Sequence, residues 1–582
     1  MTEHKKLTGY PSIDKPWLKY YSEEAINAPL PQSTLYEFFF RENKDHLDDI
    51  ALVYFGRKIT YGQMFAKIEV VRNALLNHGV KKGDKVILFT SSTPETVYLV
   101  FALCRIGAVA NMINPLFTQE QVIARINETE ATLMIALDQL ADRVLDVIPQ
   151  TRIEKTIIIP VYQSMPTVKG MLAKSKLKKN IPYSSTIITW EQFVKDCKNT
   201  MPDALYEKDC PLIMVYSSGS TGASKGIVLT NDGILATASN YYRQEYFPHE
   251  RGESFLQIIP VWFSTGIVIS LLMPMLVGVF IILEPAFSKE SFVNDIKKNR
   301  PNMTIGATSL WMYAIHCEKL AKENLSFLHY PITGGEKMLA RNEQAINDFL
   351  KKHGCHSPII QGYGMCELGG TITTASAVHH KIGSAGLPIK GVTVSAFDSD
   401  TNEEKRVGNR GEIRVNSPCR MKEYFKNPKA TDEFFWKDNS GVIWGRTGDI
   451  GYVDEDGEVF ILGRATDSCV LESGERIYLF DIEDEILKDG SVAQCKVVDI
   501  QYDNTTKLVA HVVFVKGTPD TQARIRTIHD TLRTTIHQHM VPSFYKIRDS
   551  IPVHSNGKRD VEAMKNDREN LISFNTNRKT MS

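Results

Sequence analysis

The residues best suited to chemistry form a loop at 216–226, with the sequence Tyr-Ser-Ser-Gly-Ser-Thr-Gly-Ala-Ser-Lys-Gly. Apolar runs at 211–215 and 227–230 flank this loop, and each predicts a strand. Glycines let its backbone turn, while hydroxyls, backbone N–H groups and a lysine can donate to oxygen. Donor-rich loops of this kind bind anions, phosphate above all. We therefore predict a phosphate-binding loop rather than a flexible linker, with the ligands Ser217, Ser218, Gly219, Ser220, Thr221, Gly222 and Lys225. It is not a Walker A loop, because Ser224 rather than glycine precedes Lys225.

The loop resembles the phosphate-binding signature of the adenylate-forming enzymes, which include acyl-CoA synthetases, adenylation domains of peptide synthetases and beetle luciferases. Further motifs similar to the family's follow in the family's order, at 333–337, 361–367, 444–464 and 552–560. The resemblance spans nearly the whole chain and is closest to the AMP-dependent acyl-CoA synthetase type. It implies a fold, a reaction and a role for each matching residue.

For ATP, the resemblance implies an adenine site made by Gly335, Glu336, Tyr363 and Gly364. Asp449 and Arg464 would bind the ribose. Glu367 would hold Mg²⁺, a cation that takes carboxylate and phosphate oxygens as ligands. Lys558 would be catalytic, because a lysine between the substrate carboxylate and the α-phosphate stabilises the charge that develops in the transition state.

The acyl pocket implied by the resemblance includes Trp262, Phe263 and Gly334. Phe263 stands where the family has a histidine, and Cys366 stands where it has a threonine. A thiol is a weaker donor than a hydroxyl, so the phosphate contact at 366 is in question. No acidic residue lies between Val261 and Leu283, which argues against an α-amino acid substrate.

The chain divides, by this reading, into residues 1–463, carrying the ATP and acyl sites, and a smaller mobile domain at 464–582. Thr466, where the family has a charged residue, is the predicted hinge. Lys558 and the turn at Gly474 both lie in the smaller domain, and by similarity they serve different steps. Rotation about the hinge would present Lys558 for adenylation and Gly474 for the thiol step.

Strands alternating with helices predict a parallel α/β sheet. Helices are expected at 62–78, 94–106 and 521–538, and a hairpin across Asp503. Beyond residue 386 the chain becomes rich in strands and turns. The predicted fold class is α/β, with a large N-terminal domain of flanked β-sheets plus a small barrel, and a smaller, mobile α+β C-terminal domain.

The composition of the chain restricts its possible partners and its location. The chain has 582 residues with 68 basic and 68 acidic side chains, so no nucleic-acid partner is expected. Its nine scattered cysteines, without CxxC, together with termini that lack a signal peptide or a peroxisomal signal, predict a cytoplasmic protein. The uncharged segment 261–283 is interrupted by Pro274 and Gly278, which favours a buried helix and strand over a transmembrane segment. The lysine-rich stretch 168–180 is expected to be a solvated loop or an insertion, with a membrane-surface role as the alternative.

The predicted reaction has two steps and uses ATP, Mg²⁺ and coenzyme A. A carboxylate attacks the α-phosphorus of ATP to give an acyl-adenylate, and the thiol of CoA then displaces AMP. The alternatives are an adenylating enzyme that loads a separate carrier protein, a luciferase-like monooxygenase, and a non-enzymatic nucleotide-binding homologue. The sequence does not name the acid, although Trp262, Phe263, Met273 and Met275 favour an apolar or aromatic tail.

Overall fold

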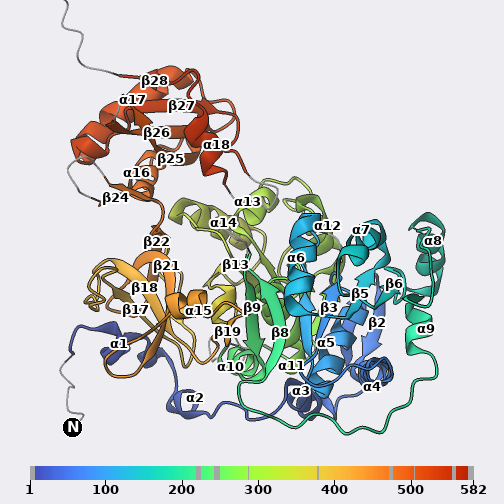
Figure 1. Ribbon diagram of the computed structural model, residues 1–582. Helices are drawn as coiled ribbons and strands as arrows, with labels where there is room; N and C mark the ends of the chain where they lie inside the picture. The colour runs from blue at the N-terminus through green and yellow to red at the C-terminus, as the bar shows by residue number, and fades with distance from the viewer. Residues whose placement is uncertain are drawn as a thin grey trace, which may run out of the picture. The chain divides into compact units, whose positions relative to one another are not determined.

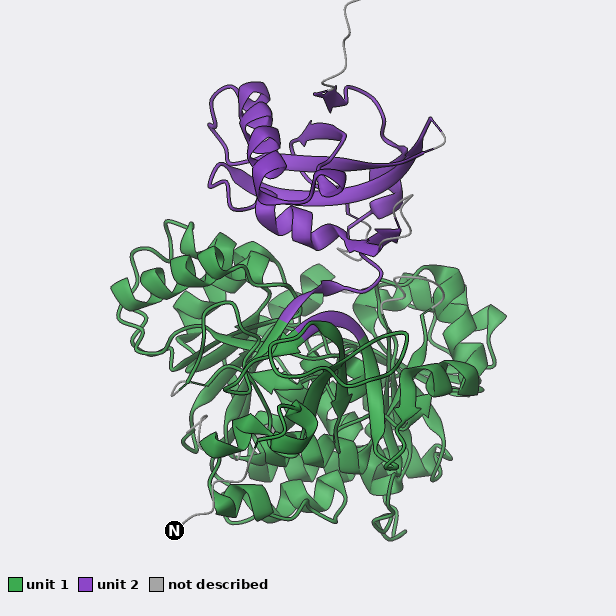
Figure 2. Cartoon of the chain, turned by 90° about the vertical axis from the view of Figure 1, so that its left-hand side faces the viewer, with its two compact units in different colours: residues 1–447, 452–460 green, residues 448–451, 461–582 purple. Residues whose placement is uncertain are grey.

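A computed structural model describes residues 7–177, 179–217, 224–241, 249–285, 287–376, 379–470, 476–503, 505–553 and 559–574. The chain forms two compact units, residues 1–447 with 452–460 and residues 448–451 with 461–582 (Figure 2). The predicted fold class, α/β with a large sheet-based N-terminal part and a smaller C-terminal part, is confirmed. The boundary at 463/464 and the mobility of the smaller part stay predictions.

A nine-stranded sheet forms one layer of the large unit, in the order β16-β15-β14-β13-β12-β10-β11-β1-β2. Its strands are β1 (Ile50–Tyr54), β2 (Arg57–Thr60), β10 (Ser254–Gln257), β11 (Phe280–Leu283), β12 (Met303–Gly306), β13 (Tyr330–Gly334), β14 (Ile360–Tyr363), β15 (Thr373–Thr374) and β16 (Leu387–Pro388). The run from β14 to β1 is parallel. The carboxyl ends of parallel strands meet at one edge of a sheet, so the motifs that follow β13 and β14 lie together.

An eight-stranded sheet forms the second layer, in the order β19-β9-β8-β4-β3-β5-β6-β7. Its strands are β3 (Lys85–Phe89), β4 (Val109–Met112), β5 (Leu133–Leu137), β6 (Lys155–Ile159), β7 (Ile187–Thr189), β8 (Pro211–Tyr216), β9 (Gly226–Thr230) and β19 (Glu423–Tyr424). The strands β8 and β9 are antiparallel, so the predicted phosphate loop joins the two strands of a hairpin.

Helices cover both sheets (Figure 1). They include α3 (Leu35–Asn43), α4 (Tyr61–Asn77), α5 (Pro94–Ile106), α6 (Gln119–Thr129), α7 (Ala141–Val147), α9 (Trp190–Val194), α10 (Asn231–Tyr241), α12 (Lys289–Asn299), α13 (Thr308–Ile315) and α14 (Ala340–Lys352). The expectation of a loop at 168–180 was wrong, because Thr167–Leu177 forms the helix α8. Lysine, leucine and methionine are good helix formers, and their propensity outweighed the low apolar content.

The uncharged segment 261–283 folds as predicted into a buried helix and a strand. Residues Thr265–Leu272 form a π-helix, η4, which continues into α11 (Met273–Leu276), and β11 follows. In the described part of the chain, no helix is both long and apolar enough to cross a membrane.

Smaller sheets complete the fold. Where a small barrel was predicted, five strands form one sheet: β17 (Thr393–Phe397), β18 (Gly411–Asn416), β20 (Phe435–Lys437), β21 (Ile443–Val453) and β22 (Val459–Arg464). The second unit has its own apolar core between α16 (Leu479–Ile486), α17 (Thr521–Thr535) and a sheet of β25 (Val492–Tyr502), β26 (Thr505–Phe514), β27 (Phe544–Arg548) and β28 (Ile572–Ser573). The predicted hairpin across Asp503 is the pair β25–β26.

Candidate active site

The described ends of the phosphate loop are tied together at its neck. The Ser217 N–H donates to the Lys225 carbonyl at 3.0 Å, and the Lys225 N–H donates to the Ser217 hydroxyl, also at 3.0 Å. Ser224 adds a third link, because its hydroxyl donates to the Ser217 carbonyl at 2.6 Å. Ser224 thus closes the neck by a hydrogen bond. The predicted ligands from Ser218 to Gly222 lie outside the described residues.

Glu367 is buried, with 8% of its surface exposed, and lies in a short 3-10 turn after β14. Its carboxylate accepts a 2.9 Å hydrogen bond from the hydroxyl of Tyr424, which is itself only 6% exposed. Burial, together with the nearby Glu367, raises the pKa of Tyr424 well above its usual range, so the phenol is a neutral donor. No signal in the sequence indicated Tyr424, which lies far from Glu367 along the chain.

Tyr424 also faces the phosphate loop. The ammonium nitrogen of Lys225 lies 4.9 Å from the centre of the Tyr424 ring, within the range of a cation–π contact. The tyrosine therefore contacts both the lysine at the loop's neck and the carboxylate predicted to hold a metal.

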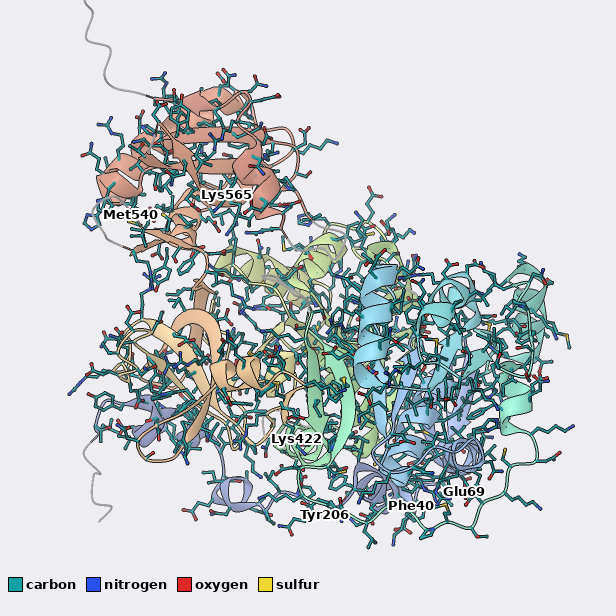
Figure 3. All side chains as sticks on the ribbon, viewed as in Figure 1. Phe40, Glu69, Tyr206, Lys422, Met540 and Lys565 are labelled. Carbon is teal, nitrogen blue, oxygen red and sulfur yellow. The ribbon has the colours of Figure 1, made fainter. Side chains whose placement is uncertain are left out.

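Residues 421–425, which we call the strap, position this cluster through the backbone. The Met421 N–H donates to the Glu367 carbonyl at 2.7 Å, and the Phe425 N–H donates to the Gly226 carbonyl at 2.7 Å. Between them, the N–H of Lys422, labelled in Figure 3, donates to the Val228 carbonyl at 2.8 Å. The strap thus connects β9 of the eight-stranded sheet to the turn that carries Glu367.

Cys366 lies next to this cluster. Burial, then the neighbouring Glu367, raises the pKa of the Cys366 thiol to about 11, while Ser264 acts in the opposite direction. The thiol is therefore protonated at neutral pH. It is offered as a weak donor and not as a nucleophile.

The predicted adenine segment contains glycines that cannot be replaced. A Cβ at Gly364 would lie 2.3 Å from the Gly370 carbonyl oxygen, which excludes any other residue there; at Gly334, predicted for the acyl pocket, a Cβ would lie a tight 3.0 Å from the Gly362 oxygen. Gly335 has a φ of +81°, and, its chain neighbours aside, no atom of the described residues lies within 4 Å of the position that a Cβ would take. A flat ligand can approach the backbone closely at such a position.

Glu336 has a structural contact that the sequence did not indicate. Its carboxylate accepts hydrogen bonds from the Ser309 N–H at 2.9 Å and from the Ser309 hydroxyl at 3.0 Å. Ser309 lies in the first turn of α13, where a carboxylate satisfies N–H groups that have no partner within the helix. The side chain of Glu336 therefore anchors the turn, and its contribution to an adenine site would come from the backbone.

Buried polar atoms without a partner among the described residues lie at the carboxyl edge of the nine-stranded sheet. They are the Thr333 hydroxyl on β13, the side-chain oxygen of Gln361 on β14, and the Thr308 hydroxyl at the start of α13. Thr333 and Gln361 are neighbours in register. Unsatisfied buried groups are costly, and a bound ligand is one way to satisfy them.

The predicted acyl-pocket residues Trp262 and Phe263 are half-buried, with ring centres 6.3 Å apart. They precede η4, which is buried along most of its length. A π-helix is rare and is frequently found at functional sites.

In the second unit, Asp449 and Arg464 form the predicted pair. Arg464 Nε lies 3.0 Å from an Asp449 carboxylate oxygen, and the side chain of Asp449 is 8% exposed. Gly448, with a φ of +68°, and the Ala465 N–H, which donates to the Gly448 carbonyl at 2.8 Å, hold the two segments together. The structure brings the two proposed ribose ligands into contact.

Thr466 is exposed, and both of its neighbours are anchored. Ala465 bonds to Gly448, while the Asp467 carboxylate accepts from the buried Lys496 ammonium at 2.9 Å. Thr466 therefore lies between two anchored residues of the second unit, and its role as a hinge stays a prediction. Lys558 and Gly474 lie outside the described residues.

A profile of the family described as AMP-binding enzyme matches residues 39–425. The chain belongs to this family. The AMP-binding enzyme is 26% identical, over 555 residues, to a long-chain-fatty-acid–CoA ligase of Bacillus subtilis, covering 94% of this chain and 96% of that protein. A ligase of the same name from Escherichia coli O157:H7 is 25% identical over 567 residues, covering 94% and 97%.

Among solved structures, the AMP-binding enzyme matches an anthranilate CoA ligase in complex with anthranoyl-AMP, at 20% identity and a TM-score of 0.77, over 91% of this chain and 96% of that one. It also matches ATP-bound MatB from Rhodopseudomonas palustris, at 20% identity and a TM-score of 0.77, over 91% and 98%. These structures support the fold. The family and the ligase relatives confirm the predicted reaction, in which ATP activates a carboxylic acid that is then joined to CoA.

Proposed function

We propose that this AMP-binding enzyme activates long-chain fatty acids. The observation that carries the proposal is the segment 261–283, which begins beside Trp262 and Phe263 of the acyl pocket that the resemblance implies. It contains no charged side chain, and nearly all of it is buried in η4, α11 and β11. The segment has no carboxylate that could hold a substrate amine, and its apolar composition is compatible with an apolar substrate tail. The relatives named as long-chain-fatty-acid–CoA ligases, matched over almost their full length, support the same substrate class.

Mg²⁺ is part of the proposal, with Glu367 as its protein ligand. A single buried carboxylate fits this role, because Mg²⁺ in nucleotide sites keeps few protein ligands and takes phosphate oxygens for the rest. When bound, the ion would neutralise charge on the phosphates. Tyr424 would orient the carboxylate by its hydrogen bond, and the neck formed by Ser217 and Lys225 would position the donors of the phosphate loop.

The remaining roles are proposals of the same kind. Asp449 would accept from the ribose hydroxyls, with Arg464 holding its carboxylate. Lys558 would stabilise charge during adenylation, and Gly474 would face the incoming thiol. Thr466 would be the point about which the domain at 464–582 turns between these two steps. The nine cysteines, none of them in a disulfide, support a cytoplasmic location.

The substrate test is a pyrophosphate-release screen with octanoate, laurate, palmitate, oleate, aryl acids and amino acids, each with and without CoA. We expect kcat/KM to rise with chain length, by about fourfold for each added methylene that is buried. A preference for aryl or amino acids would overturn the proposed substrate. Thioester formed on a carrier protein but not on CoA would favour the carrier-loading alternative.

The domain proposal is tested by separating the two half-reactions. Lys558→Ala should abolish pyrophosphate release yet still convert supplied acyl-adenylate to thioester. Gly474→Leu should show the opposite pattern, and Lys516→Ala, at an exposed position of the same unit, should affect neither. Loss of the same half-reaction in both Lys558→Ala and Gly474→Leu would contradict the alternation of domains.

A further inference from the structure

The helix α8 carries an apolar face on its outer side. Figure 1 shows α8 at the margin of the large unit, near α7 and above α9. Its inner side is made by small residues: a Cβ at Gly170 would lie 3.6 Å from the Tyr162 carbonyl oxygen, and Ala173 is half-buried. The Gln139 amide donates to the Leu177 carbonyl at 3.3 Å, and the Lys169 ammonium donates to the Phe55 carbonyl at 2.8 Å. The helix is thus attached to the domain by one face and both ends.

Three large apolar side chains project from the opposite face. Val168, Met171 and Leu172 are 71%, 67% and 59% exposed. Their spacing of three and four residues places them on one stripe of the helix. Because the inner side of α8 already makes the contacts with the domain, this stripe does not serve the core.

Lysines border the stripe on both sides. At 100° per residue, Lys169 and Lys176 lie along one border and Lys174 along the other. The charged side chains of the surrounding sequence are all positive, because no aspartate or glutamate occurs from Lys155 to Trp190. Lys179, just beyond the helix, pairs with Asp142 at 2.9 Å, whereas Lys174 and Lys176 form no ion pair among the described residues.

We propose that α8 binds the surface of an anionic lipid bilayer, with Val168, Met171 and Leu172 entering the boundary of the acyl chains and Lys174 and Lys176 contacting lipid headgroups. An apolar stripe with basic borders is the pattern of helices that lie in a membrane interface. A stripe of three side chains on a convex helix is much smaller than a stable protein–protein interface, which buries about 800 Å² on each partner. The charge and the size together favour a bilayer over a protein partner.

This inference does not depend on the proposed substrate, because vesicle binding is measured without acid or ATP. If the substrate is a long-chain fatty acid, membrane binding would bring the enzyme to the phase in which such acids dissolve. A failure of vesicle binding would leave the substrate proposal intact, and a different substrate would leave membrane binding intact.

The test is cosedimentation of the full chain with vesicles of phosphatidylglycerol and phosphatidylcholine, compared with vesicles of phosphatidylcholine alone. Binding should require phosphatidylglycerol and should weaken as salt increases. Lys174→Gln with Lys176→Gln should weaken partitioning by about 25-fold, because each lysine near an anionic surface contributes about fivefold. Met171→Ser with Leu172→Ser should weaken it by at least about tenfold.

Matched controls come from the same unit. Met201 and Leu205 are 58% and 82% exposed, so their double replacement by serine removes the same side-chain types elsewhere. Lys351→Gln with Lys352→Gln removes two charges from the end of α14. Both controls should bind vesicles like the wild type. In the variant Leu172→Trp, the fluorescence of the added tryptophan should be quenched by brominated lipid.

The proposal is overturned if the wild type does not partition into anionic vesicles, if the α8 variants bind as well as the wild type, or if the controls lose binding equally. Vesicle binding that is lost only in the lysine variant would show non-specific electrostatic attraction. That result, with unchanged binding of Met171→Ser with Leu172→Ser and no quenching of fluorescence in Leu172→Trp, would also overturn the proposal.

Discussion

Removing one hydroxyl, in Tyr424→Phe, should impair adenylation through the metal site. The ring and its contact with Lys225 remain, but the 2.9 Å hydrogen bond to the Glu367 carboxylate is lost. Glu367 is 8% exposed and Tyr424 6% exposed, so water cannot readily replace the donor. A hydrogen bond to a charged acceptor contributes about 1.5–3 kcal/mol. At about 1.4 kcal/mol for each factor of ten, this corresponds to a decrease of roughly 10- to 150-fold.

The assay is pyrophosphate release as a function of Mg²⁺ concentration at saturating acid. If Tyr424 orients the carboxylate that holds Mg²⁺, Tyr424→Phe should lower kcat/KM within that range and raise the Mg²⁺ concentration needed for half-maximal rate. Tyr54→Phe is the matched control, because it removes a buried hydroxyl that donates to the Val161 carbonyl at 2.8 Å and does not touch Glu367. A folded Tyr424→Phe with an unchanged Mg²⁺ dependence would refute the reasoning, even if its stability fell.

Three other substitutions test the site and the second unit. Asp449→Ala should raise the KM for ATP by about tenfold or more, because it removes a charged acceptor for the ribose; unchanged ATP kinetics would contradict that role. Cys366→Thr should preserve or improve adenylation, since the protonated thiol is a weak donor, whereas a large loss in a folded variant would give Cys366 a role of its own. His511 is fully buried, and burial and Arg548 lower its pKa to about 4. As pH falls below about 6.5, this histidine takes up a proton in the unfolded chain but not in the folded one. The free energy of unfolding of the second unit should therefore fall by roughly 3 kcal/mol between pH 6.5 and pH 4. Denaturant titrations at several pH values would measure this dependence of the free energy of unfolding on pH. If the same dependence persisted in His511→Asn, it would be due to other groups.

The elements that local sequence determines were predicted well. The helix expected at 94–106 is α5, which begins with Pro94 after a threonine cap and ends before Gly107 in the left-handed region. The uncharged segment 261–283 was separated into helix and strand at Gly278, whose φ is +83°. Residues such as Gly107 and Gly278 interrupt regular structure by local geometry, which a sequence records directly.

Contacts between distant segments could not be read in the same way. Tyr424 is one tyrosine of 22 in the chain, and nothing near it in sequence indicates that its hydroxyl meets Glu367. The helix α8 was missed because its apolar stripe has only three large side chains and faces away from the domain, while small residues face the domain. The contact of the Glu336 side chain with Ser309 was likewise not indicated by the sequence, and the adenine-binding role of this segment stays a prediction.

The strap at 421–425 sets when this site can be completed during synthesis. Strand β9 and the phosphate loop leave the ribosome nearly two hundred residues before β19, and the turn with Glu367 leaves more than fifty residues before it. Until residue 425 has emerged, β9 is paired with β8 but lacks its second partner strand, β19, and Glu367 lacks its tyrosine. Contacts of such long sequence separation form slowly and leave an exposed strand edge in the nascent chain. A nascent chain released before the strap would retain most of both sheets and yet lack the connection between β9 and the turn that carries Glu367.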